Sequence, residues 1–307
     1  MLPAVSIVAT PGRRRQALEA AREVERRGFA GIYVPSLFDG LGFCEALALT
    51  TERIRFGTTI ANIYTRHPTE YAATAALIHE LSGGRFVFGV GVSHGPVHRY
   101  LGITPGRPLQ DVRAFVQALR GGRTTGGAGF GAPGPLPPVV LAALRANMVR
   151  LASEIAEGVV WANAARSHMP ASLAHLRPEQ RTGEDFFVGN MIPTCIAEDR
   201  EAAAAVLRRV LTGYVQLPNY QNYWIEAGYA EEMQAIRAAI AAGELERLPA
   251  LMSERWLRDV TLFGTPAEVR AGLEAWYAAG VKTPILVPLS INGGQFKALE
   301  EVVAAFA

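Results

Sequence analysis

The stretches RIRFGTTIANIYTRHP (residues 53–68) and LSGGRFVFGVGVSHG (residues 81–95) each contain an apolar run of strand length. These runs lie at 54–61 and 85–92, and they are nearly continuous rather than alternating. The segment between them, 69–82, has apolar residues at helical spacing, and two glycines end it. Continuous apolar runs that alternate with helices are typical of parallel strands covered on both faces.

The same alternation extends over most of the chain. Further apolar runs lie at 4–9, 32–34, 138–143, 158–162, 186–196 and 285–289, and helix-like segments at 13–27, 42–50, 108–120, 148–155, 198–211 and 296–306. Thr265 begins another helix with a capping-box pattern. Eight strands with intervening helices predict an α/β fold, a (β/α)8 TIM barrel that uses residues 1–307 as a single domain. A doubly wound open sheet is the alternative, because both folds are βα repeats.

Three features interrupt the repeat. Pro193 lies inside the seventh run and predicts an edge, a bulge or an early end of that strand. Residues 121–138 are rich in Gly and Pro and predict a loop. Residues 218–259 contain no strand-like run, so we expect a helical insertion before the last strand.

An aromatic cluster lies in and beside this insertion. Its members are Tyr214, Tyr220, Tyr223, Trp224 and Tyr229. The cluster either packs the insertion on the barrel or forms a lid over a flat aromatic ligand.

Composition excludes several classes of protein. The net charge is +2, from 30 basic and 28 acidic residues, which gives no reason to expect a nucleic-acid partner. No apolar run approaches ~18 residues, so we expect no membrane span, and the run at 4–9 is too short for the core of a secretion signal. Cys44 and Cys195 form no CxxC or Cys/His cluster, which predicts reduced thiols, a cytoplasmic location and no structural zinc.

In a barrel of this kind the site lies where the strands end, because the loops after the strands converge there. The polar residues that follow the predicted strands are rich in hydrogen-bond donors, and Asp39 is the one acidic residue among them. This composition argues against a pair of catalytic carboxylates and against a divalent-metal site, so we expect no metal.

The segment GVGVSHG at 89–95 matches two motifs only in part. It is out of register for GxGxxG, and no acidic residue follows at the right distance, which argues against a dinucleotide site. It contains GxSxG, but a hydrolase triad needs a late histidine and the last one is His175. The segment is either a strand end shaped by its glycines, or a place where backbone amides with Ser93 and His94 bind a ligand.

Four blocks together resemble the luciferase-like monooxygenase superfamily. Besides 53–68 and 81–95, they are PVVLAALRANMVRLASEIAEGVV (138–160) and GTPAEVRAGLEAWYAAGV (264–281). They occur in the family's order and cover most of the chain. The chain looks most like the branch that depends on coenzyme F(420), an 8-hydroxy-5-deazaflavin, while other members of the superfamily use FMN.

The resemblance implies a TIM barrel with a flavin-type cofactor at the C-terminal mouth. It implies a non-prolyl cis peptide between Thr59 and Ile60 behind the ring system. Residues that match family positions around the ring and its ribityl chain, or at the neighbouring edge of the fifth strand, are Asn62, Thr65, Val92, Ser93, His94, Ala142, Ala143 and Leu144. Arg66 or Arg145 is expected to meet the phosphate through charge-assisted hydrogen bonds.

The chain departs from the family at three positions. Ser36-Leu37 stands where many deazaflavin users have Asp-His, and we expect Ser36 to lie at the cofactor. His94 stands where some relatives have Glu. Arg145 replaces the glycine of the usual Ala-Leu-Gly-Pro, so it either crowds the phosphate site or supplies it with a charge.

The expected function is an oxidoreductase that moves a hydride between reduced F(420) and a small organic substrate. His94 is expected to donate a proton or to polarise the ring or the substrate, with Ser93 and Asn62 anchoring the ring edge. The alternatives are an FMN-dependent monooxygenase and a non-catalytic flavin-binding protein. A homodimer is compatible with the resemblance, because dimers are common in the family.

Overall fold

The computed structural model describes residues 2–121 and 134–306. Most of the segment predicted as a Gly/Pro loop at 121–138 lies outside these residues. The strands are β1 (Ala4–Ser6), β2 (Gly31–Val34), β3 (Arg55–Thr58), β4 (Ala61–Asn62), β5 (Phe86–Gly91), β6 (Val139–Ala142), β7 (Gly158–Ala162), β8 (Phe187–Ile196), β9 (Leu262–Gly264) and β10 (Thr283–Leu289).

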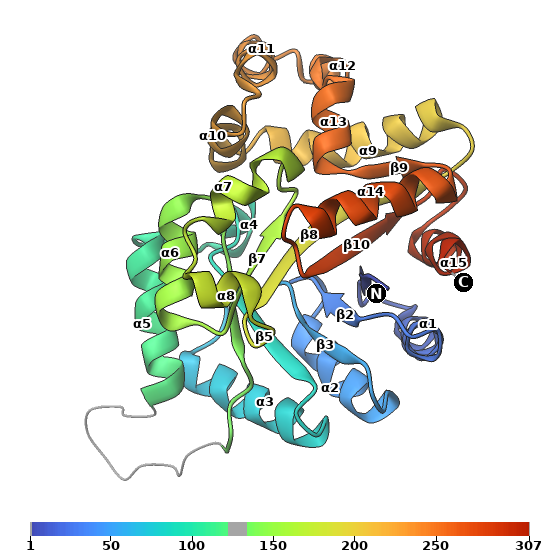
Figure 1. The fold of residues 1–307 in the computed structure, drawn as a ribbon. Coiled ribbons are helices and arrows are strands. Elements are labelled where there is room, and N and C mark those ends of the chain that lie inside the picture. The colour runs from blue at the N-terminus through green and yellow to red at the C-terminus, as the bar shows by residue number, and fades with distance from the viewer. Residues whose placement is uncertain (1, 122–133, 307) are drawn as a thin grey trace.

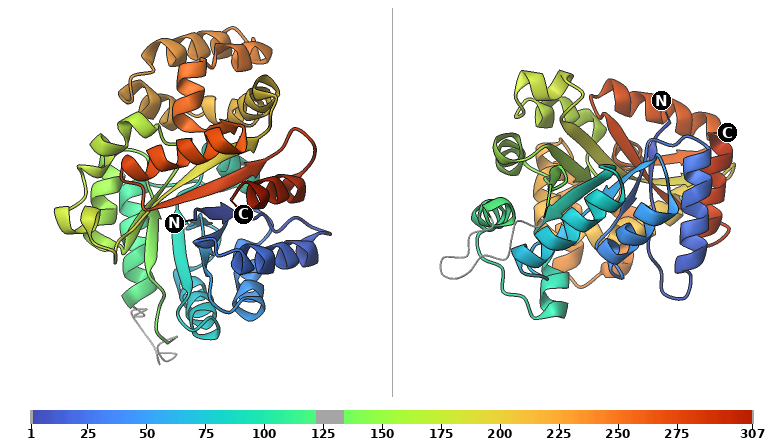
Figure 2. Two further views of the ribbon diagram at one scale, coloured as in Figure 1. Left: turned by 45° about the vertical axis from the view of Figure 1, so that its right-hand side comes forward. Right: turned by 90° about the horizontal axis from the view of Figure 1, so that it is seen from below.

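The strands form a closed parallel ring. Its order is β1, β2, β3, β5, β6, β7, β8 and β10, and β10 pairs in parallel with both β1 and β8. The ring closes because Ile285 of β10 is in register with Ala4 on one side and with Met191 on the other. The predicted (β/α)8 TIM barrel is therefore confirmed, and an open doubly wound sheet is excluded (Figures 1 and 2).

Helices surround the ring (Figure 2, right). They are α1 (Arg14–Arg26), α2 (Gly40–Thr50), α3 (Pro68–Leu81), α4 (Gly95–Leu101), α5 (Pro108–Gly121), α6 (Ala146–Ile155), α7 (Met169–Leu173), α8 (Pro178–Thr182), α9 (Arg200–Val215), α10 (Pro218–Glu226), α11 (Ala230–Ala241), α12 (Leu248–Leu251), α13 (Glu254–Val260), α14 (Pro266–Ala278) and α15 (Gln295–Ala305), with short 3₁₀ turns at Arg166–His168 and Leu245–Arg247. In the described part of the chain, no helix is both long and apolar enough to cross a membrane.

Two apolar clusters hold the barrel together. The larger one joins the strands to the helices around them, for example Phe88 of β5 to Tyr71 of α3, whose ring centroids are 5.5 Å apart. The smaller one includes Ala4, Val140, Val160 and Ile285 from four different strands. Burial on both faces explains why the strands read as continuous apolar runs.

The third predicted strand, 54–61, is divided in the structure. β3 ends at Thr58, Thr59 and Ile60 belong to no strand, and β4 covers only Ala61–Asn62. Sequence alone suggested one unbroken strand because β-branched and aromatic residues, which favour extended backbone, lie on both sides of the break.

The expectation that Pro193 marks an edge, a bulge or an early end is wrong. β8 runs through it and pairs with β10 from Gly189 to Cys195. On the other side of β8, pairing with β7 ends at Met191 and pairing with β9 begins at Thr194. Pro193 lies in the gap between these two pairings, so its missing N–H breaks no ladder there.

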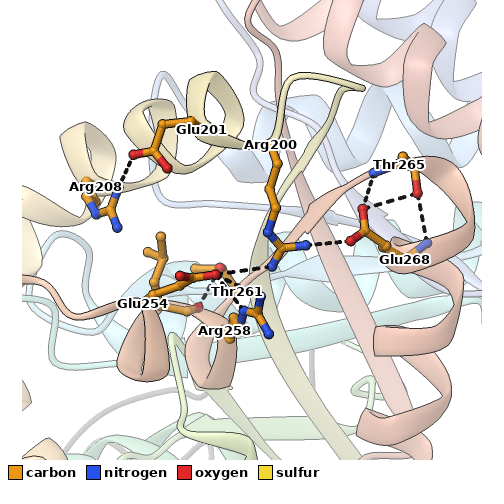
Figure 3. Close-up of polar contacts among 9 residues, drawn as sticks. Arg200, Glu201, Arg208, Glu254, Arg258, Thr261, Thr265 and Glu268 are labelled. Carbon is orange, nitrogen blue, oxygen red and sulfur yellow. Dashed lines mark hydrogen bonds and ion pairs between the residues drawn. The ribbon is translucent and has the colours of Figure 1, made fainter.

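The predicted helical insertion at 218–259 is present as helices α10 to α13, which lie together at one end of the molecule (Figure 1). Ion pairs connect it to the barrel helices (Figure 3). Arg200, at the start of α9, reaches Glu254 of α13 at 3.6 Å and Glu268 of α14 at 2.5 Å. Thr265 and Glu268 form the predicted capping box of α14.

Glycines allow β3 and β5 to approach each other closely. A Cβ atom added to Gly89 would lie 1.9 Å from the carbonyl oxygen of Thr58, and one added to Gly57 would lie 2.3 Å from the carbonyl oxygen of Val87. The Thr58 hydroxyl donates a hydrogen bond of 2.7 Å to the carbonyl of Gly89 across the same gap. Neither strand can carry a larger residue here without moving its neighbour.

Replacing this glycine therefore tests the close approach. Gly89→Ala should lower the free energy of unfolding by about 3 kcal/mol or more, because backbone rather than a flexible side chain must move. Gly213→Ala is the matched control. Gly213 lies near the end of α9 with nothing within 4 Å of an added Cβ, so that change should raise stability by about 0.5–1 kcal/mol. Urea unfolding measures both, and equal effects of the two substitutions would contradict this account.

Candidate functional site

A cavity of about 880 Å³ lies at the C-terminal ends of the barrel strands. Its wall comes from the ends of several strands, from the helices α4, α5 and α6 that follow them, and from α9 and α10. The lining includes residues 35–37, 59–60, 92–95, 142–148 and 160–162, with Tyr214, Asn219, Tyr220 and Glu226 from α9 and α10. This is where the sequence placed the site, because the loops that follow parallel strands meet at one end of a barrel.

Ten of the thirteen residues predicted for the site line this cavity. They are Ser36, Thr59, Ile60, Val92, Ser93, His94, Ala142, Ala143, Leu144 and Arg145. The other three, Asn62, Thr65 and Arg66, are not among the described residues of its wall.

Those three side chains organise the turn after β4 instead. The Asn62 side-chain oxygen accepts a hydrogen bond from the Tyr64 amide, and the Thr65 hydroxyl donates to the Asn62 carbonyl at 2.9 Å. Arg66 forms an ion pair with Asp39 at 3.1 Å. In the structure they therefore support the loop behind the cavity.

The expected cis peptide is present between Thr59 and Ile60, and both residues line the cavity. Ile60 lies over β5, since a Cβ added to Gly91 would be 3.3 Å from its side chain. The same added Cβ would be 2.8 Å from the Cβ of Ala142 on β6. Because residue 91 has no side chain, Ile60 and Ala142 form a continuous apolar surface across it.

Ser93 and His94 follow β5 directly. Ser93 has φ of 61°, a left-handed conformation that is uncommon for residues other than glycine. His94 precedes the first turn of α4, and its ring lies 5.6 Å from the Tyr220 ring and 6.2 Å from the Tyr214 ring. Its Nδ1 atom is buried without a hydrogen-bond partner among the described residues.

Burial lowers the pKa of His94, and the neighbouring His98 adds to this effect. A lowered pKa favours the neutral imidazole at pH 7. A neutral imidazole both donates and accepts a hydrogen bond, which suits polarisation of a ligand atom better than delivery of a proton from an imidazolium.

The aromatic cluster of the insertion is divided between two roles. Tyr223 and Trp224 hold the insertion on the barrel through hydrogen bonds: the Tyr223 hydroxyl accepts from the Ala165 amide, and the Trp224 indole donates to the Asn163 carbonyl. Tyr229 donates to Asp259 within the insertion, and Asp259 in turn accepts from Ser167 outside it. Tyr214 and Tyr220 instead line the cavity, with ring centroids 5.2 Å apart.

Trp161, Asn219 and Glu226 are among the cavity residues that were not predicted as site residues. Trp161 is inside the sixth strand, where it reads as an ordinary core residue. Asn219 and Glu226 lie on α10, far from the strand ends in sequence, so only the packing of the insertion brings them to the cavity.

Arg145 and Glu226 form an ion pair at the cavity wall. The Arg145 Nε atom donates to Glu226 Oε1 at 2.8 Å, and its Nη2 atom contacts the same oxygen. The Glu226 carboxylate raises the pKa of Arg145. The arginine that replaces the family's glycine therefore has a partner that the insertion supplies.

Comparison with known proteins agrees with this geometry. The family model described as luciferase-like monooxygenase matches residues 3–283. The chain belongs to this family. Among curated relatives, it is 26% identical over 274 residues to a putative coenzyme F(420)-dependent oxidoreductase of Mycobacterium tuberculosis, covering 76% of this chain and 78% of the relative. It is 23% identical over 300 residues to a 5,10-methylenetetrahydromethanopterin reductase of Methanolobus tindarius, covering 91% and 92%.

Solved structures share the family's fold. The coenzyme F(420)-dependent tetrahydromethanopterin reductase of Methanopyrus kandleri superposes with a TM-score of 0.76 at 20% identity, with all of both chains covered. The oxygenating constituent of 3,6-diketocamphane monooxygenase from Pseudomonas putida, in complex with FMN, superposes with a TM-score of 0.64 at 15% identity, covering 98% and 96%. The family thus contains oxidoreductases and monooxygenases on this barrel.

The pKa of His94 gives a testable effect on stability. As pH falls below about 6.5, this histidine is protonated in the unfolded chain but resists protonation in the folded chain. The free energy of unfolding therefore decreases as the pH is lowered. His94→Gln removes this proton uptake. In urea unfolding, the free energy of unfolding of the wild type should fall relative to that of the variant between pH 7.5 and pH 5.5. A difference between the two proteins that does not change with pH would mean that burial does not perturb the pKa of His94.

Proposed function

We propose that this protein is an oxidoreductase that moves a hydride between reduced coenzyme F(420) and a small organic substrate in the cavity. The observation that carries the proposal is the apolar surface of Ile60 and Ala142 beside the Thr59–Ile60 cis peptide, at the position that the family resemblance assigns to the back of a flat ring. The named F(420)-dependent relative supports the choice of cofactor.

The cavity wall fits a cofactor of this type. Ile60, Val92 and Ala142 offer apolar surface for a flat ring. Thr59 Oγ1 and Trp161 Nε1 are buried polar atoms of the wall with no partner among the described residues. Buried polar groups are normally hydrogen-bonded, so small side-chain movements toward the polar edge of a ring would satisfy them.

The cofactor supplies the hydride when it is bound, and the chain supplies position, shielding from water and proton control. The buried ends of β5, β6 and β7 exclude water from the inner cavity. The neutral His94 imidazole would hydrogen-bond a ligand atom in the cavity and hold a proton there. Arg145 would hold a phosphate tail of the cofactor in place of its ion pair with Glu226.

An FMN-dependent monooxygenase is the second candidate. Ser36-Leu37 replaces the Asp-His pair of many deazaflavin users, and an FMN complex occurs among the structural neighbours. The same replacement favours the third candidate, a flavin-binding protein without catalysis. Oxygen consumption with reduced FMN distinguishes the second candidate, and tight cofactor binding without turnover of any electron acceptor identifies the third.

A cytoplasmic location and a homodimer remain predictions. The buried free thiols of Cys44 and Cys195 are consistent with a reducing compartment.

Side-by-side titration with F(420) and FMN, followed by absorbance, tests the cofactor. F(420) should bind more tightly than FMN, and Ala142→Leu should weaken binding at least tenfold because the larger side chain covers the ring surface. Ala304→Leu, on the exposed face of α15, is the control and should leave affinity unchanged. A preference for FMN would favour the monooxygenase, and binding of neither cofactor would reject the proposal.

Replacing His94 tests its role in turnover. His94→Ala should leave cofactor affinity nearly intact and lower turnover by ~10²-fold, because a positioned acid or base contributes about that much. Unchanged turnover would remove His94 from the mechanism, and an equal loss of affinity and turnover would assign it a structural role.

A further inference from the structure

We propose that the substrate of this cavity carries no negative charge and has an apolar body. This inference rests on the proposed function, because it describes the second molecule that shares the cavity with the cofactor. It follows from how charge is distributed on the wall and from which side chains form the rim.

The wall offers no unpaired charge to an ionic substrate. Among the described residues that line the cavity, Arg145 and Glu226 are the only ones with a formal charge, and they neutralise each other. The His98 ring nitrogen Nε2 lies 2.5 Å from the Val92 carbonyl oxygen, and burial lowers the pKa of His94, which favours its neutral form. An ion that leaves water for such a wall loses its hydration without gaining a counter-charge.

Cofactor binding would not reverse this conclusion. If a cofactor phosphate takes Arg145 from Glu226, the cation is still neutralised, and the group set free is a carboxylate. An anionic substrate therefore meets either a closed ion pair or a negative charge. A cationic substrate meets the closed pair before the cofactor binds and the freed Glu226 carboxylate afterwards, so only an anion is disfavoured in both states.

The rim of the cavity is apolar and exposed. Leu37, Val97 and Leu109 line the cavity, yet they are 50%, 37% and 38% exposed. They come from the loop after β2, from α4 and from the start of α5. Single exposed apolar side chains are common on proteins, but a group of them that continues a cavity wall is typical of a groove for an apolar ligand.

The inner wall can accept a ring. Tyr214, Tyr220 and His94 face one another with centroid distances of 5.2–6.2 Å, and all three line the cavity. Edge-to-face contacts of this kind favour aromatic partners. A flat apolar probe with a small polar group therefore matches the wall.

Two probes of the same shape separate charge from size: 2-naphthalenemethanol, which is neutral, and 2-naphthoate, which is anionic. Calorimetric titration of the cofactor-free chain should show at least tenfold tighter binding of the alcohol. When the titration is repeated in the presence of saturating cofactor, the alcohol should still bind. Naphthoate binding as tight as that of the alcohol, or displacement of the cofactor by the alcohol, would overturn the proposal.

Glu226→Gln leaves Arg145 unpaired. Naphthoate affinity should then rise at least tenfold, while alcohol affinity changes less than threefold. Glu244→Gln is the matched control, because Glu244 pairs with Arg247 elsewhere in the insertion and neither residue lines the cavity. The double variant with Arg145→Gln should lose the gain. A gain that persists there would reflect a loosened α10 and would count against the proposal.

Val97→Asp tests the rim and should weaken binding of the alcohol at least threefold. Leu49→Asp, on the exposed face of α2, is the control and should leave that affinity unchanged. Equal effects of the two substitutions would reject the apolar rim. The outcome is independent of the cofactor test. If the chain prefers the alcohol to naphthoate but binds neither F(420) nor FMN, the inference about charge holds and the redox function is rejected. If the chain binds a cofactor but does not distinguish the two probes, the redox function holds and the inference about charge is rejected.

Discussion

The contact between Thr58 and Gly89 is the constraint on which the barrel and its cavity both depend. With no side chain at residues 57 and 89, β3 and β5 approach until the Thr58 hydroxyl reaches the Gly89 carbonyl at 2.7 Å. β3 ends at Thr58, directly at this contact, and the Ile60 side chain that follows lies over the glycines of β5. Gly91, two residues further along β5, also leaves room for its neighbours, so that Ile60 and Ala142 share one apolar surface. The strand spacing that closes the ring thus also shapes its open end.

Most of the fold was predictable because parallel strands and amphipathic helices leave periodic traces in the sequence. The pattern identified all eight strands of the ring and the helical insertion. It missed the short helices α4, α7 and α8, of five to seven residues, and the three-residue strand β9, since all four are too short for periodicity to register. The prediction for Pro193 failed because a proline disrupts a strand only where its missing N–H would pair with a neighbouring strand. Which strands pair beside Pro193 is decided by tertiary structure.

The candidate site divides in the same way. Residues that directly follow or end a strand, such as Ser93, His94 and Arg145, were predicted because strand ends converge in a barrel. Asn62 and Thr65 are not on the cavity wall, because the chain turns back after β4 and uses their polar groups to hold Tyr64 and Tyr71. Glu226 could not be predicted from the sequence, since its position opposite Arg145 depends on how the insertion packs on the barrel. The insertion thus changes the charge of the wall without altering the barrel.

A crystal structure of the chain with its cofactor bound tests most directly whether this barrel end holds a flat redox ring. The account predicts the ring against Ile60 and Ala142, with the Thr59–Ile60 peptide at its back and the phosphate tail at Arg145. A ring bound elsewhere, or an inner cavity filled by Tyr214 and Tyr220 while the cofactor lies on the outer surface, would contradict it.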